Sequence, residues 1–342
     1  MKFTKYIFLI FIIPIYCQFG KNIVQYKSFD WHYIQSKYFD VYFYDSDKGS
    51  TSINSNAEFV ARESLKSYDI ISNAIGWKLK NRIPIIVYNS HNDFQQTNII
   101  DMYMPEGVGG VTELYKNRVV IPFDGNNNQF KTVIHHELVH AFINDYIYKG
   151  SIQNMQNDDV ILIPLWMNEG LAEFLSTPWQ TESDMWMRDL VVNGEKLPKL
   201  NELNGYLAYR GGQSVWKYIV EELDTLYIQG KTEAPSIIAS IFSAISTSPD
   251  LNTALEKALN LDLESLESGW HKYLKSEYWP DINNRDYLDD ISSSIFDYEK
   301  VSSTYDIGPS LSPDKSKLAF YSNQKGIMSL CIVPSDCKDC SS

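Results

Sequence analysis

Cysteine is scarce in this sequence, and the long middle of the chain has none. Four of the 342 residues are cysteines, and none lies between Cys17 and Cys331. Apolar packing or a metal ion must therefore hold that part of the fold without disulfides. Cys331, Cys337 and Cys340 lie close to the end of the sequence. A lone C-x-x-C there predicts local pairing or an unmatched thiol rather than a second metal site.

Positive charge is also in short supply. Forty-three acidic residues against thirty basic ones leave a formal net charge of −13, which repels phosphate backbones and anionic lipid surfaces. This balance predicts that nucleic acid is not a partner. The sequence is nevertheless 44% hydrophobic and 14% aromatic. That composition indicates a folded chain, long enough to bury one large core or two smaller ones.

The apolar run near the N-terminus is too short to span a bilayer. It covers residues 6–16, follows two lysines and is interrupted only by Pro14. These features predict a signal peptide over residues 1–20, and hence an exported protein of the periplasm, cell envelope or extracellular space. An uncleaved membrane anchor is one alternative. Lipidation at Cys17 is another, although the preceding residues are not the small ones that such processing prefers. Membrane contact would then be confined to this segment.

Strand-forming segments come first in the chain, and helical segments follow. The expected strands cover residues 38–44, 83–88 and 118–123, with a helix over 54–75 between the first two. The later helices are expected over residues 129–146, 165–175, 209–223 and 251–278, the last with a break near Asn260. Strands followed by helices predict an α+β domain over residues 21–280, with a small mixed sheet.

A different pattern follows this domain. Residues 281–304 are polar with little periodicity, which predicts a linker, and residues 305–342 contain three short strands separated by turn sequences. The text "LSPDKSKLAFYSN" resembles the repeat of TolB-like β-propellers, S-P-D-G-x-x-[IL]-A-F, with Lys315 in place of the glycine. The resemblance implies a partial propeller blade and a surface for a protein partner. A stray β-meander is the alternative, because one repeat cannot display a period.

The text "HHELVH" at residues 135–140 contains the motif H-E-x-x-H. On a helix, His136 and His140 lie one turn apart on the same face, so both imidazoles can reach one ion while Glu137 projects beside them. The flanking residues are apolar, as a buried helix requires. Two structural histidines on an ordinary helix are the alternative.

A catalytic zinc needs three protein ligands and an open position for water. The segment "WMNEGLAEF", residues 166–174, offers Glu169 and Glu173 on one face of a second helix. The 28 residues between His140 and Glu169 suffice to finish the first helix, cross a loop and return alongside it. Together these residues predict a His-His-Glu zinc site.

These two segments resemble the gluzincin metallopeptidases, and "WMNEG" is similar to the W-x-N-E-G text of zinc aminopeptidases. The likeness extends over residues 39–279. The whole chain resembles secreted bacterial proteins of the peptidase MA-like family that have a TolB-like propeller behind the protease domain. The resemblance implies a zincin fold of gluzincin type, with Glu169 as the third ligand and Glu173 as an outer partner that holds a histidine. The gap between the helices is longer than in thermolysin-like enzymes, which leaves their exact placement open.

The chemistry expected of such a site is peptide-bond hydrolysis. Zinc lowers the pKa of its bound water from about 15.7 toward 7, and Glu137 would act as general base and then as proton donor to the leaving amine. A second oxyanion donor is expected beside the metal. Tyr209 is the candidate, because "YRGGQSVW" resembles the Y-x-x-G stretch of zinc aminopeptidases. Its alternative role is packing, and Tyr206 lies three residues away.

Substrate binding is expected along residues 107–123, which occupy the place of the gluzincin edge strand. Gly110 and Glu113 match the G-x-M-E-N stretch with which zinc aminopeptidases bind a free amine, but Thr112 and Leu114 depart from it. Gly110 would permit close backbone approach or belong to an ordinary turn, and Glu113 would bind an amine or be solvated. An endopeptidase that takes peptide or protein substrates is therefore favoured over an aminopeptidase.

The sequence thus predicts an exported, zinc-dependent peptidase. A non-catalytic envelope scaffold, in which a protease-like domain and a propeller bind partner proteins, is the alternative. The intact Glu137 argues against it, because a scaffold has no need of a base beside its metal. A purely structural zinc site is disfavoured by the open fourth position.

Overall fold

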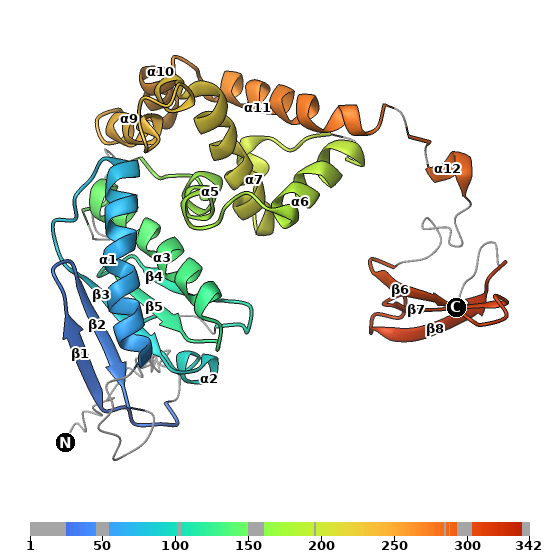
Figure 1. The fold of residues 1–342 in the computed structure, drawn as a ribbon, viewed down its shortest axis with the longest axis horizontal. Helices are drawn as coiled ribbons and strands as arrows, with labels where there is room; N and C mark the ends of the chain where they lie inside the picture. The colour runs from blue at the N-terminus through green and yellow to red at the C-terminus, as the bar shows by residue number, and fades with distance from the viewer. Residues whose placement is uncertain are drawn as a thin grey trace, which may run out of the picture. The chain divides into compact units, whose positions relative to one another are not determined.

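A computed structural model describes residues 25–45, 55–100, 104–149, 161–194, 196–283, 285–286, 288–292 and 303–336 (Figure 1). The expected signal peptide, Cys17, Cys337 and Cys340 lie outside these ranges. The chain divides into two compact units, Met1–Glu277 and Tyr278–Ser342. Among the residues described, no helix is both long and apolar enough to cross a membrane.

The first unit is built on a five-stranded mixed sheet with the order β1-β2-β3-β5-β4. Its strands are β1 (Trp31–Gln35), β2 (Phe39–Tyr44), β3 (Ile83–Tyr88), β4 (Val111–Glu113) and β5 (Arg118–Pro122). The three central strands are parallel, and the edge strands β1 and β4 run antiparallel to their neighbours. The central strands are those predicted from the sequence. Both edge strands were missed.

Alternation along the central strands separates two buried faces. One face, with Phe39 and Ile121, lies against α1 (Ser55–Ile75) and α3 (Asn127–Ile147), which pack side by side (Figure 1). The other face is covered by the loops after β3. Its core residues are Tyr44, Ile86, Tyr88, Phe94, Met104 and Val120. Because β5 leads directly into α3, the sheet fixes where that helix begins.

The rest of the first unit is helical. Its main helices are α5 (Leu165–Ser176), α6 (Thr181–Val192), α7 (Tyr206–Tyr218), α9 (Ser236–Ile245), α10 (Leu251–Leu259) and α11 (Leu263–Tyr278). Short segments complete it: α2 (His91–Phe94), η1 (Leu200–Glu202), α8 (Thr225–Ile228) and a π-helical turn η2 (Ile219–Leu223) after α7. A further short segment, η3 (Trp279–Asp281), belongs to the second unit. The predicted break is confirmed, since Asn260 ends α10 in the left-handed region with a φ of 57°. Helices α6 and α9 were not predicted.

Helices α5 and α7 cross in backbone contact. A Cβ atom added at Gly212 would lie 2.2 Å from the carbonyl oxygen of Trp166, and one added at Gly170 would lie 2.3 Å from the carbonyl carbon of Gly212. Any larger residue at this crossing would force the helices apart. The close approach brings the first turn of α7 next to the side chains that α5 presents to α3.

The second unit is a three-stranded antiparallel sheet of β6 (Asp306–Leu311), β7 (Lys317–Ser322) and β8 (Ser329–Pro334). The three predicted strands are therefore confirmed. Phe320 and Val333 are buried on one face. Lys315 has a φ of 60°, a left-handed conformation that favours glycine. Cys331 is a free thiol, and a one-turn helix, α12 (Leu288–Ile291), lies in the expected linker.

Candidate metal centre

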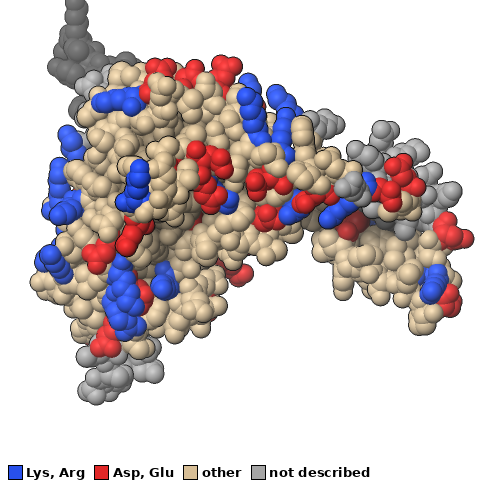
Figure 2. All heavy atoms as spheres, turned by 45° about the horizontal axis from the view of Figure 1, so that its top comes forward, with Lys and Arg blue, Asp and Glu red and all other residues tan. Residues whose placement is uncertain are grey.

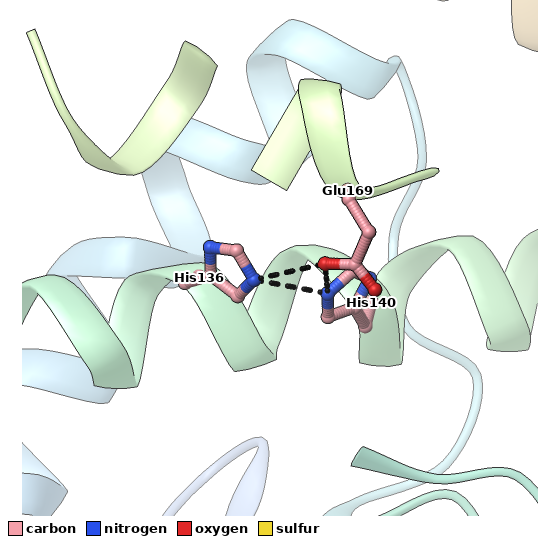
Figure 3. Close-up of side chains that lie close together, drawn as sticks. All are labelled: His136, His140 and Glu169. Atoms are coloured by element: carbon pink, nitrogen blue, oxygen red, sulfur yellow. Dashed lines mark hydrogen bonds and ion pairs between the residues drawn. The ribbon is translucent and has the colours of Figure 1, made fainter. Parts of the chain in front are cut away.

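Helix α3 is a buried helix that begins at a polar cap. The Asn126 side chain accepts hydrogen bonds from the backbone N–H groups of Asn128 and Gln129, which satisfies two of the free donors of the first turn. Most residues after Phe130 are buried, so the apolar flanks of the motif hold the helix in the core. The helix presents His136 and His140 toward α5, where Glu169 lies (Figure 3).

Three side chains from these two helices converge on one point. The Nε2 atom of His136 lies 3.2 Å from Nε2 of His140 and 3.3 Å from Oε2 of Glu169, and His140 Nε2 lies 3.2 Å from the same oxygen (Figure 3). A tetrahedral ion with bonds of about 2.0–2.1 Å sets neighbouring ligand atoms about 3.3 Å apart. The triangle therefore matches one face of such a tetrahedron, and the three residues can hold a metal ion.

The second ring nitrogen of each histidine meets an acceptor. His136 Nδ1 lies 3.2 Å from Oε1 of Glu173, and His140 Nδ1 lies 3.2 Å from Oδ1 of Asn168. A proton on Nδ1 donated to these acceptors leaves both Nε2 lone pairs directed at the metal position. Glu173 is itself held by Arg210, whose Nη1 donates to Oε2 at 2.7 Å. Ligand orientation is thus fixed from α5 and α7 together.

The charges of the cluster support cation binding. Burial alone would lower the pKa of His136, but its hydrogen bonds to Glu169 and Glu173 raise it to about 10. Burial likewise acts to raise the pKa of Glu169, and the two histidines nevertheless hold it well below its usual range. Protonation of His136 therefore competes with metal binding, so the affinity for a metal ion falls as pH is lowered.

The neighbouring His135 behaves differently. Burial lowers its pKa to about 4, and the residue is only 8% exposed. His135 is therefore a neutral core histidine, whereas His136, on the next position of the helix, belongs to the site.

Glu137 lies beside the triangle and is 6% exposed. The Thr112 hydroxyl is 2.7 Å from its Oε2 atom and 2.9 Å from its backbone carbonyl oxygen. A methyl group added at Gly110 would lie 3.0 Å from the Cγ atom of Glu137. The segment around β4 therefore contacts both the stem and the carboxylate of this glutamate.

Tyr209, from the first turn of α7, also reaches the site. Its ring lies parallel to that of His136, with centroids 6.0 Å apart and an interplanar angle of 13°. Burial and the carboxylates of Glu169 and Glu137 raise the pKa of its hydroxyl, so Tyr209 is a neutral donor at physiological pH. The rival Tyr206 is 43% exposed and its hydroxyl accepts from Arg210 Nε at 2.9 Å.

A groove runs past these residues, made of three adjoining cavities of ≈ 370, ≈ 400 and ≈ 390 Å³. The outer two each share residues with the middle one, which is lined by His136, Glu137 and Tyr209. Helices α3, α5 and α7 form one side, called here the helical wall. Residues 108–114 form the other side, called here the strand wall. His140 and Glu169 line only the third cavity, whereas His136 lines the second and the third, so the metal position lies in the third cavity beside its junction with the second.

Glu113 does not join the site. Its Oε2 atom accepts from Arg118 Nε at 2.7 Å, and its Oε1 atom accepts from the backbone N–H of Lys116 at 3.2 Å. It is not among the residues described as lining the groove, whereas Thr112 and Leu114 are. This geometry disfavours the amine-binding role expected from the resemblance. Gly110 does line the groove, in two of its cavities.

Sequence reasoning missed Asn168, Arg210 and Thr112. Asn168 directly precedes Glu169, and Arg210 directly follows Tyr209, so polar residues next to assigned ones were a usable signal. Thr112 gave none, because its contact with Glu137 depends on how the sheet edge meets α3.

These features define a peptidase-type domain with a metal-binding donor set. One helix supplies two histidines and a glutamate, a second helix supplies a further carboxylate, and the edge of a mixed sheet borders the groove. The chain belongs to the Peptidase MA superfamily, whose family model matches residues 66–276, more than half of the sequence. No curated protein sequence matches the chain. Membership indicates hydrolase activity on a peptide or protein, and proteins of this superfamily typically depend on a metal.

Proposed function

We propose that this protein is an exported zinc metallopeptidase of gluzincin type that cleaves peptide bonds as an endopeptidase. The observation that carries the proposal is the convergence of His136, His140 and Glu169 beside Glu137 in an open groove. Two imidazoles and one carboxylate are a donor set typical of catalytic zinc, with the fourth position left for water. Zinc bound there would lower the pKa of its water toward 7 and polarise the scissile carbonyl.

The residues of the chain have separate roles in the proposed reaction. Glu137, which is not a ligand, takes a proton from the attacking water and later delivers it to the leaving amine. Tyr209 donates its hydroxyl proton in a hydrogen bond to the oxyanion that forms as the carbonyl is attacked. Its raised pKa keeps that proton in place. Glu173, through its contact with His136, keeps the ligand ring in orientation.

The form of the groove supports endopeptidase action. The three ligands line the third cavity, and the groove continues from it through the second cavity into the first, so a substrate chain has room to extend away from the site. Strand β4 is an edge strand, paired with β5 alone, and an extended peptide can add to such an edge through backbone hydrogen bonds. The pairing of Glu113 with Arg118 removes the main argument for an amine-binding exopeptidase.

Export and the role of the second unit belong to the same proposal. The N-terminal apolar run supports a signal peptide, with lipidation at Cys17 as a variant of it. The meander of β6, β7 and β8, with Lys315 in a left-handed conformation, supports a blade-like unit that offers a surface to a protein partner. Acidic and basic side chains are interspersed on the face that Figure 2 shows, and we propose no nucleic-acid partner. The intact Glu137 argues against the alternative of a non-catalytic scaffold, because a scaffold needs no base beside its metal.

A comparison of wild type with Glu137→Gln tests the catalytic proposal. We expect purified wild type to hold about one zinc per chain and to cleave members of a peptide library, N-acetylated ones included, at internal bonds. The variant should keep its metal and lose about 10²–10⁴-fold in kcat, because the base is not a ligand. A chelator should abolish cleavage and added zinc restore it. If wild type and variant were equally active, the catalytic role of Glu137 would be excluded.

A further inference from the structure

The hairpin of β4 and β5 contacts helix α3 through the side chains of Asn117 and Thr112. At the β4–β5 turn, Asn117 Nδ2 donates to the carbonyl oxygen of Ala141 at 2.9 Å. On β4, Thr112 Oγ1 lies 2.7 Å from Glu137 Oε2. The first contact is backbone-directed and holds the hairpin against α3. The second reaches the carboxylate of the proposed base itself, and neither contact involves a metal ligand.

The Thr112 hydroxyl has two acceptors but a single proton. The carbonyl oxygen of Glu137 is 2.9 Å away, and the carboxylate oxygen is 2.7 Å away. A charged acceptor makes the shorter and stronger hydrogen bond. The proton is therefore directed at Oε2, which leaves Oε1 as the oxygen available to water. Gly110 packs against the stem of the same side chain, because a methyl group added at Gly110 would lie 3.0 Å from Cγ of Glu137.

We propose that Thr112 is a positioning residue that fixes the carboxylate of Glu137 by donating a hydrogen bond to Oε2. It ties the base to the same strand along which the substrate would lie. A glutamate side chain has three rotatable bonds, and its stem alone does not fix the carboxylate plane. With the hydroxyl in place, one carboxylate oxygen of Glu137, a residue that lines the groove, is held by Thr112. This inference rests on the proposed catalytic role of Glu137.

Thr112→Val removes the hydroxyl and keeps the β-branched shape, and Thr112→Ser keeps the hydroxyl. We expect the valine variant to lose about 10–100-fold in kcat, as losses of outer-shell partners and small misplacements do. Its KM and zinc content should match wild type. The serine variant should restore most of the kcat. Thr112→Ala, which also lacks the hydroxyl, replaces the valine variant if that protein does not fold.

Thr253→Val is the matched control. The Thr253 hydroxyl also donates to a carboxylate, Oδ2 of Asp250 at 2.6 Å, but on exposed helix α10. We expect this variant to keep the wild-type kcat. If it fell as far as Thr112→Val, the loss would report on general stability, and the inference would be overturned.

Crystal structures of wild type, Thr112→Val and Thr112→Ser provide a readout that needs no activity. The inference expects the Glu137 carboxylate in one conformer in the two hydroxyl-bearing proteins and displaced or multiple in the valine variant. An unchanged Glu137 in Thr112→Val, an equal loss of kcat in the valine and serine variants, or loss of zinc from the valine variant would each overturn it. If wild type cleaves no peptide, the catalytic proposal fails, and these structures still decide whether Thr112 fixes the carboxylate.

Discussion

The two walls of the groove hold their functional side chains by different means. On the helical wall, His136 and His140 are separated by one helical turn, and so are Glu169 and Glu173, so each pair is aligned by the backbone of its own helix. On the strand wall, β4 has three residues, and Thr112 meets Glu137 across 25 positions of sequence. One wall is organised locally and the other by tertiary contact.

This difference separates metal binding from the placement of the base. The side chains that orient the metal ligands belong to the helical wall: Asn168 contacts His140, Glu173 contacts His136, and Arg210 holds Glu173. Contacts to Glu137 come from the strand wall, through Gly110 and Thr112. Changes on the helical wall should therefore alter metal content, and changes on the strand wall should alter turnover in a protein that keeps its metal.

The largest effect is expected on the helical wall, from Glu169→Ala. This change removes one of three ligand atoms, and the site should lose its metal and all activity. Glu173→Ala, one turn away, removes only the partner of His136 and should weaken zinc affinity by about 10–100-fold. Competition with a chromogenic chelator measures both affinities. If Glu173→Ala emptied the site and Glu169→Ala did not, the roles of the two glutamates would be reversed.

Tyr209→Phe tests a residue of the helical wall that is not a ligand. Loss of one oxyanion donor costs about 10²–10³-fold in kcat, and we expect that loss here with unchanged zinc content and KM. Tyr206→Phe is the matched comparison, because its hydroxyl already interacts with Arg210 and Glu182. Equal turnover of wild type and Tyr209→Phe, measured at saturating peptide, would assign Tyr209 to packing.

Gly110→Ala tests the strand wall. The added methyl would lie 3.0 Å from Glu137 Cγ, Ile121 Cγ2 and Val133 Cγ1. Because Ile121 is fully buried in the core, the methyl would have to displace Glu137 or Val133, which both line the groove. A shift of the base should lower kcat on the order of tenfold without loss of zinc.

Gly107→Ala is the control for this change, since a methyl there would meet nothing within 4 Å. Its kcat should stay at the wild-type value. Loss of zinc from Gly110→Ala would contradict the separation of the two walls, because it would mean that the strand wall also supports the ligands.

The features predicted best from the sequence are those that depend on one helix or one strand alone. Spacing within a helix identified His136 and His140, and the central strands were evident from their runs of β-branched and aromatic residues. Strand β4 was missed because three residues cannot display alternation, and β1 was missed because most of it is exposed. The contact of Thr112 with Glu137 was beyond sequence reasoning, since it requires the position of the sheet edge relative to α3.

The smallest effect is expected from Glu113→Gln, on the strand wall but turned away from the groove. The carboxylate of Glu113 is paired with Arg118 at 2.7 Å, so a substrate amine would have to displace that partner. The ratio of kcat/KM for free-amine and N-acetylated versions of one peptide should be the same in wild type and variant. If wild type preferred the free amine by about tenfold or more, as a charge-assisted hydrogen bond would produce, and the variant lost that preference, Glu113 would bind the amine. The protein would then act as an aminopeptidase, and both walls of the groove would contribute to substrate recognition.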